Sequence, residues 1–106
     1  MTVAELNAQR LQARFADLDV EPLHDLPLRR PARFGGEVRG LHHSGHDGLP
    51  VLRVTFSDGT DTATAVFSGR RRIRGFEAGR IVLFEGVARR EKGRLVVLNP
   101  AYTLVP

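Results

Sequence analysis

Four arginines fall within five consecutive positions of the segment SGRRRIRGF, residues 68–76. A guanidinium group binds phosphate oxygens through paired hydrogen bonds, so such a cluster could hold the backbone of a nucleic acid. Successive positions of a helical turn diverge by about 100°, and only residues four apart point the same way. The segment therefore has two interpretations: phosphate contact through Arg70 and Arg74, or a solvent-exposed connector with an ion pair or two.

A second basic cluster surrounds a predicted turn at Lys92 and Gly93. It consists of Arg89, Arg90, Lys92 and Arg94. Cationic side chains at this tip could neutralise phosphates, and such binding would weaken steeply with salt. Charged residues are also normal on a solvated hairpin tip, and both interpretations stay open.

The segment HHSGHDG holds residues that could ligate zinc, namely His42, His43, His46 and Asp47. A closed zinc site usually needs four well-placed ligands, whereas the spacing here is irregular and rich in glycine. We expect a loop whose histidines face water or a ligand, with no metal and no other cofactor.

Catalytic patterns are few. The chain contains no cysteine, and no G-x-S-x-G motif surrounds Ser44, Ser57 or Ser68. Asp58 and Asp61 flank a tight turn, where aspartate is expected to make local hydrogen bonds. We expect a protein that is not an enzyme.

These residues must be positioned by a helix followed by strands. Residues 2–18 predict a helix, with Thr2 and Glu5 as a capping box. Its apolar stripe comprises Ala4, Ala8, Leu11, Phe15 and Leu18. Prolines at 22, 27 and 31 then indicate an extended connector, so residues 1–30 form a leader and residues 31–106 the domain. The helix either docks on this domain or meets a protein partner or a second copy.

From Phe34 onward the hydrophobic period is two, and we expect five antiparallel strands in a barrel or sandwich. Gly35 and Gly36 would allow a bulge or bend in the first strand, and HHSGHDGLP would be a loop. Alternation predicts that strands two and three turn one set of residues inward: Leu52, Val54, Phe56, Ala63, Ala65 and Phe67. A register slip of one residue would reverse this. The segments that predict strands are 34–41, 51–56, 60–67, 80–91 and 94–105.

Composition agrees with a single small domain of 106 residues. Residues 31–106 carry twelve basic and seven acidic residues, a net charge of +5, which is typical of nucleic-acid binding. Apolar runs are far too short to cross a membrane. The absence of cysteine fits a cytoplasmic location.

Five strands with a short helical insert between the third and fourth form the layout of the OB-fold, a Greek-key barrel. Three segments resemble, in this order, the OB domain of the RecG helicase wedge: FSDGT, VFSGRRRIRGFEAGR and FEGVARREKGRLVVLNPAY. They are closer still to small free-standing actinobacterial OB-fold proteins described as RecG-like. The resemblance covers residues 34–105 and not the leader helix. No phosphate-binding loop of a helicase motor is present, so the chain cannot drive unwinding with ATP.

The resemblance implies a binding face on strands two and three and the loops beside it. It would contain Arg53, Thr55, Thr64, Arg70, Arg74, Arg89, Arg90, Lys92 and Arg94. With Phe56 and Phe67 inward, this face offers no aromatic ring for base stacking. We therefore expect a non-enzymatic module that binds nucleic acid, DNA above all, through phosphates and with little sequence specificity. The alternative is a regulatory adaptor that uses the barrel as scaffold and the helix for docking.

Overall fold

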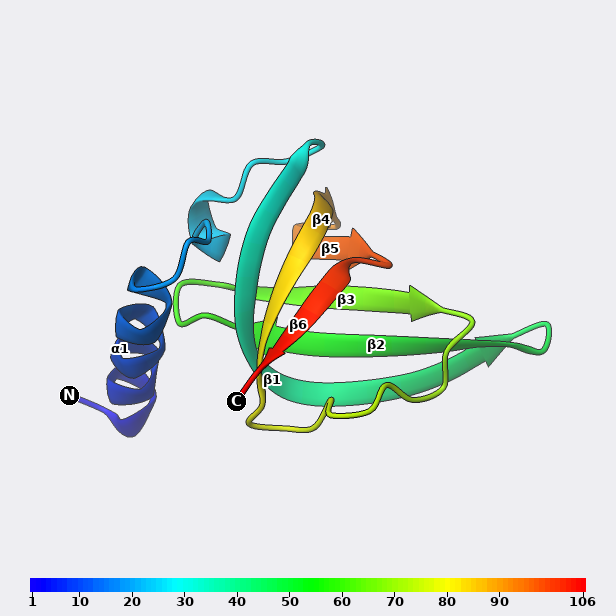
Figure 1. Cartoon of the computed structure of the whole chain (residues 1–106), viewed down its shortest axis with the longest axis horizontal. Helices are drawn as coiled ribbons and strands as arrows, with labels where there is room; N and C mark the ends of the chain where they lie inside the picture. Colours follow the sequence, from blue (N-terminus) through cyan, green and yellow to red (C-terminus); the bar gives the residue numbers. More distant parts are fainter.

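The computed structural model describes the backbone of residues 1–106 and every side chain except that of His46. It is mostly β, with one N-terminal α-helix, and this confirms the expected class (Figure 1). The helical elements are α1 (Val3–Ala16) and the 3-10 helix η1 (Leu23–Asp25). The strands are β1 (Pro31–His46), β2 (Leu49–Ser57), β3 (Thr62–Ser68), β4 (Ile81–Glu91), β5 (Arg94–Leu98) and β6 (Ala101–Val105).

Five strands form a closed ring in the order β1-β2-β3-β5-β4, because β4 pairs with β1 as well as with β5. The pairs are antiparallel, except that β3 and β5 run parallel. β6 adds to the edge of β4 beside its first five residues. Closure of the ring leaves few unpaired strand edges.

The expected fifth strand, residues 94–105, is divided at Asn99 and Pro100, and the count of five strands is therefore wrong by one. Asn99 has a φ of 46°, and its N–H donates to the carbonyl of Val66 at 2.7 Å. The side-chain oxygen of Asn99 accepts from the N–H of Ser68 at 2.9 Å. Proline has no N–H for a sheet bond. The chain therefore leaves the edge of β3 here, and β6 follows β4 alone.

The core lies inside the ring and follows the predicted alternation. Leu52, Val54, Phe56, Ala63, Ala65 and Phe67 are all at most 4% exposed, so the predicted register is confirmed. The Phe56 ring lies 4.5 Å from the Phe84 ring and 6.3 Å from the Phe34 ring, centroid to centroid. Burial of each such ring contributes about 1.5–3 kcal/mol to folding.

The glycine-rich segment after Leu41 was predicted to be a loop. This prediction is wrong, because the segment belongs to a long β-hairpin. Pairing of β1 with β2 continues to His46 and Leu49. The turn consists of Asp47 and Gly48, with φ of 53° and 78°. Asp-Gly favours such a turn because both positions need positive φ. Residues 44–51, the hairpin arm, therefore extend from the ring (Figure 1).

The bulge in β1 also lies elsewhere than expected. Register shifts between Val38 and Gly40, not at Gly35 or Gly36. The two earlier glycines are needed for close packing: a Cβ on Gly35 would lie 2.7 Å from the Val82 carbonyl oxygen, and one on Gly36 would lie 2.7 Å from the Phe56 ring. Such distances are too short for any side chain, so β1 passes directly over β4 and β2 at these positions.

Helix α1 is docked on the ring. The Glu5 N–H donates to the Thr2 hydroxyl oxygen at 3.1 Å, as in the predicted cap, but the Glu5 carboxylate accepts from that hydroxyl rather than from a backbone N–H. Leu11 and Phe15 are each 6% exposed and pack with Ile81. The predicted stripe is therefore largely covered by the chain's own β domain.

The turn between β2 and β3 is held by Asp58, which is 3% exposed. One carboxylate oxygen accepts from the Leu23 N–H at 2.9 Å, and the other accepts from the N–H and hydroxyl of Thr60 at 2.9 and 2.6 Å. The predicted local role of this aspartate is confirmed, and it also fastens η1 to the ring.

Residues 69–80, the connector between β3 and β4, form successive turns and bends without the expected short helix. Ile73 and Phe76 are 3% and 7% exposed and belong to the core, as predicted. Four arginines of the connector are exposed, namely Arg70, Arg71, Arg72 and Arg74, whereas Arg80 at its end is partly buried.

Candidate nucleic-acid interface

Strand register gathers several predicted residues on one surface. Thr55 opposes Thr64 across β2 and β3, and Thr64 opposes Val96 across β3 and β5. Val96 in turn opposes Arg89 across β5 and β4. Directly opposed residues share a face of a sheet, and so do residues two apart on a strand. The outer face, as we name this surface, therefore includes His42, Arg53, Thr55, Thr64, Arg89 and Arg94.

The charge of the outer face comes mainly from Arg53 and Arg94. Both are exposed, and within the described residues neither forms an ion pair. Arg89 also lies on this face, but its guanidinium contacts the Glu91 carboxylate at 2.8 Å. The outer face thus offers two free guanidinium groups, one neutralised arginine and threonine hydroxyls. Such a face binds phosphate oxygens better than it binds a cationic ligand.

The other two predicted residues of the β4–β5 hairpin lie apart from this face. Arg90 has the same parity on β4 as buried Ala88, and its guanidinium lies 3.6 Å from the Asp61 carboxylate and 2.9 Å from the Gly93 carbonyl oxygen. Lys92 is exposed at the turn itself, with a φ of 52°. The hairpin therefore does not present its four basic residues together.

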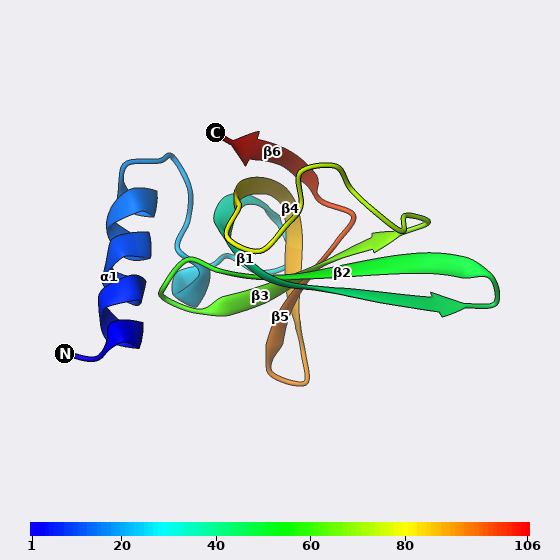
Figure 2. The ribbon, with the colours of Figure 1, turned by 90° about the horizontal axis from the view of Figure 1, so that it is seen from below.

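Arg70 and Arg74 lie on the opposite side of the sheet. Figure 2 shows the connector passing over one side of β2 and β3, while the turn between β4 and β5 projects from the other. Ile73 and Phe76 of the connector are buried, whereas Arg70 and Arg74 are exposed. The predicted residues thus form two separate basic surfaces rather than one continuous strip.

No phenylalanine or tyrosine ring lies on the outer face, and the chain has no tryptophan. All phenylalanines of the chain are buried, as expected for Phe56 and Phe67. Tyr102 is partly buried and packs edge-on against Phe76, with ring centroids 4.9 Å apart. Base stacking on aromatic side chains, worth about 1–3 kcal/mol per base, is therefore not provided by this face.

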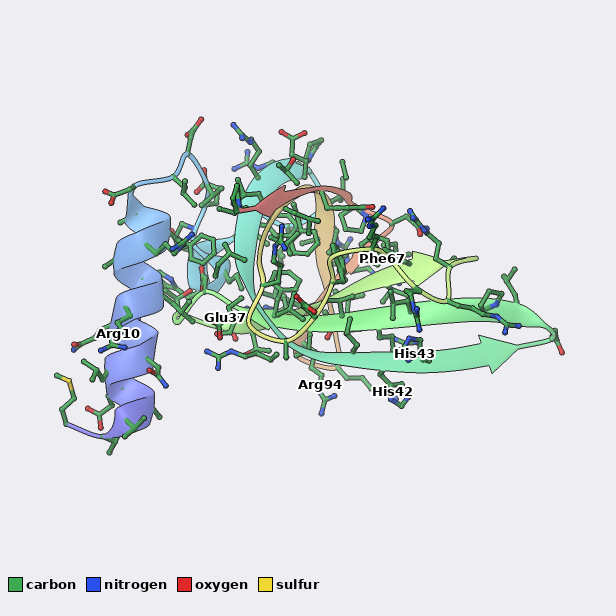
Figure 3. The ribbon with its side chains drawn as sticks, turned by 60° about the horizontal axis from the view of Figure 1, so that its bottom comes forward. Arg10, Glu37, His42, His43, Phe67 and Arg94 are labelled. Atoms are coloured by element: carbon green, nitrogen blue, oxygen red, sulfur yellow. The ribbon has the colours of Figure 1, made fainter. Side chains whose placement is uncertain are left out.

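The histidines at the base of the arm point to opposite faces, as adjacent strand residues must. His42 opposes Arg53, whereas His43 opposes buried Leu52. In Figure 3, His42 and Arg94 lie on one side of the sheet, away from Phe67. Among the side chains that the structure describes, no three histidines, cysteines or acids come close enough to hold a metal ion. His46, a residue of a type that could ligate zinc, lies outside the described side chains.

The sequence did not predict the positions of two residues, His42 and Arg71. His42 joins the outer face only because the presumed loop is a strand, which the Asp-Gly turn signal could have indicated. Arg71 lines a hollow of about 490 Å³ beside the arm, with His43 and Leu49 among its neighbours. No sequence signal places Arg71 there, since the connector's path depends on the whole ring.

Comparison with known proteins adds no relative to these observations. No protein-family model matches the chain, and no curated protein matches it either. Within the described residues, no helix is both long and apolar enough to span a lipid bilayer.

Proposed function

We propose that this chain is a non-enzymatic OB-fold module, related to the RecG wedge, that binds nucleic acid with its outer face. The strand order β1-β2-β3-β5-β4, closed by β1 with β4, supports an OB-type barrel. In such barrels the face of strands two and three and the neighbouring loops bind the ligand. Here these parts are the outer face, the hairpin arm and the β4–β5 turn.

One observation carries the proposal: Arg53 and Arg94 are exposed on the same face, and among the side chains that the structure describes neither forms an ion pair. They lie two strands apart, about 10 Å, and are offset by about 13 Å along the strands. A nucleic-acid strand advances about 3.4 Å per nucleotide, so the two guanidinium groups span several phosphates. Thr55 and Thr64 lie between them and can donate hydroxyl hydrogen bonds to the same backbone.

The chemistry of this face favours little sequence specificity. Phosphate contacts position a protein but carry no sequence information, and there is no exposed aromatic ring for bases. Affinity would come from counterion release and would fall steeply with salt. Duplex or branched DNA, with its denser phosphates, would bind more tightly than a single strand.

The adaptor hypothesis draws less support. It relied on a helix stripe free to dock, but Leu11 and Phe15 already pack against Ile81. In addition, the Gln12 side-chain amide donates to the Gly59 carbonyl oxygen at 3.0 Å. The large apolar residues of α1 that stay exposed are Val3 and Leu6, a small surface at its first turns.

The test is fluorescence anisotropy with labelled single-stranded, duplex and forked DNA of one sequence and its scramble, at about 20 and 150 mM salt. We expect binding at low salt that weakens at least ten-fold at the higher salt. We also expect forked or duplex DNA to bind more tightly than single-stranded DNA, and the scramble to make little difference.

Two charge-matched double variants locate the surface. Arg53→Gln with Arg94→Gln should weaken binding about ten-fold or more, because two phosphate contacts are lost. Arg70→Gln with Arg74→Gln removes the same charge from the connector and should change the dissociation constant by about two-fold at most. No binding at low salt would refute the proposal, and equal losses in both variants would refute the assignment to the outer face.

A further inference from the structure

A second basic site lies at the other end of the molecule, where α1 meets the ring. A hollow of about 550 Å³ is lined by Arg10, Leu11 and Arg14 of α1, by Glu37 of β1, and by Arg80 and Ile81. Figure 3 shows Arg10 on α1 and Glu37 on the part of the sheet nearest the helix. We call the three basic residues of this hollow, Arg10, Arg14 and Arg80, the arginine pocket.

The three guanidinium groups lack partners. Within the described residues, none of them forms an ion pair or a side-chain hydrogen bond. The Nε of Arg80 is fully buried and has no acceptor. Glu37 is the one acidic side chain on the wall, and its carboxylate lies 3.5 Å from Arg39, outside the pocket. Among the side chains that line the hollow, three guanidinium groups therefore stand against one carboxylate, an excess of positive charge.

The backbone around the pocket is held in place. Arg10 and Arg14 are four residues apart on α1 and flank Leu11, which is 6% exposed. The carbonyl of Arg80 accepts from the Val38 N–H at 2.8 Å, and the Gly79 N–H donates to the Val38 carbonyl at 2.8 Å. Arginines four apart on a helix repel each other, so an anion between them and Arg80 would relieve a cost built into the fold.

Multivalent oxyanions fit this arrangement best. A phosphate offers several acceptor oxygens, and each guanidinium can engage two of them. The exposed guanidinium groups of Arg10 and Arg14 offer N–H donors to an oxygen that enters the hollow. The volume lies within the range of small-molecule sites, about 300–1,000 Å³, and exceeds what a single phosphate fills.

We propose that the arginine pocket binds a small ligand through a phosphate or pyrophosphate group. The site is independent of the outer face, because none of its residues belongs to that face. Its ligand could be free polyphosphate or the phosphate chain of a nucleotide, and the chemistry recognised is the same in both.

The test is isothermal titration of the full chain with inorganic phosphate, pyrophosphate and ATP, without divalent metal and at low chloride. We expect saturable one-to-one binding of pyrophosphate, tighter than that of phosphate. ATP that binds like pyrophosphate points to free polyphosphate as the source, whereas much tighter ATP binding points to a nucleotide. If pyrophosphate shows no saturable binding up to about 5 mM, the proposal is overturned, because the dissociation constant is then too high for useful recognition.

Charge-matched variants distinguish binding in the arginine pocket from non-specific attraction by the protein's positive charge. Arg10→Gln with Arg80→Gln should weaken pyrophosphate binding about ten-fold or more, whereas Arg72→Gln with Arg74→Gln should leave it unchanged. Equal weakening in both would mean non-specific attraction and would also overturn the proposal. Circular dichroism establishes that each variant is folded. Arg10→Gln with Arg80→Gln should still bind forked DNA, so failure of the pocket is distinguishable from failure of the outer face.

Discussion

The connector and the outer face are both rich in arginine, yet their arginines are placed by different means. In the connector, buried Ile73 and Phe76 fix the path of the chain, and the arginines take the remaining outward directions. On the outer face, strand register aligns Arg53 with Thr55 and with the residues opposite them. Density of charge along the sequence therefore does not show which side chains share a surface, whereas parity on paired strands does.

The largest effect is expected when a buried apolar side chain that fixes the path of the connector is removed. Phe76 is 7% exposed and packs against Tyr102 and Phe67, with ring centroids 4.9 and 5.6 Å away. Phe76→Ala should lower the free energy of unfolding by about 3–5 kcal/mol, measured by urea denaturation. Arg74→Ala, two residues away, should change it by about 0.5 kcal/mol at most. A similar loss in both would mean that the arginines, too, hold the connector.

The next test concerns the turn that precedes Phe76. Gly75 has a φ of 90°, and a Cβ there would collide with Leu104 Cδ1. Gly69 has a similar φ of 79°, but a Cβ there meets nothing within 4 Å. Gly75→Ala should cost about 2–3 kcal/mol of unfolding free energy, and Gly69→Ala about 1 kcal/mol, because only the first adds a clash to the strained backbone. Equal costs in urea denaturation would show that β6 does not restrain the connector.

A smaller effect is expected on the outer face. Arg53→Gln should weaken binding to forked DNA about eight-fold at 0.1 M salt, and should reduce the slope of log affinity against log salt by about one. The free energy of unfolding should stay within about 0.5 kcal/mol of the wild type, since Arg53 is exposed. An unchanged slope in anisotropy titrations would place the phosphates elsewhere.

The smallest effect should come from the carboxylate on this face. Glu91 lies 2.8 Å from the Arg89 guanidinium, an exposed pair worth about 0.2–1 kcal/mol. Glu91→Gln should free Arg89 and strengthen DNA binding about two- to three-fold. Glu77→Gln changes the charge equally in the connector and should have little effect. Weaker binding by Glu91→Gln in the same titration would contradict a role for Arg89 on this face.

Much of the fold was predictable because its signals are local. Alternation predicted the buried sides of β2 and β3, and the helix stripe predicted Leu11 and Phe15 as docking residues. The hairpin arm was missed because glycine and histidine suggested a loop, although the Asp47–Gly48 turn was a signal for a hairpin. The division at Asn99 depends on a hydrogen bond that Asn99 donates to the Val66 carbonyl and one that it accepts from the Ser68 N–H. Both residues lie about thirty positions away, so no local pattern reveals these bonds.

The amino-acid sequence by itself determined which side of β2 and of β3 faces the core, because a period of two leaves one choice once the apolar set is known. It also determined the role of Asp58, because an aspartate before a tight turn bonds its own neighbours. Only the tertiary structure decided that the connector and the β4–β5 turn lie on opposite sides of β2 and β3, and that Arg10 and Arg80 share a hollow. These placements are fixed only when segments that are far apart in the sequence pack together to close the ring. Neither composition nor residue spacing specifies how such segments are oriented relative to one another.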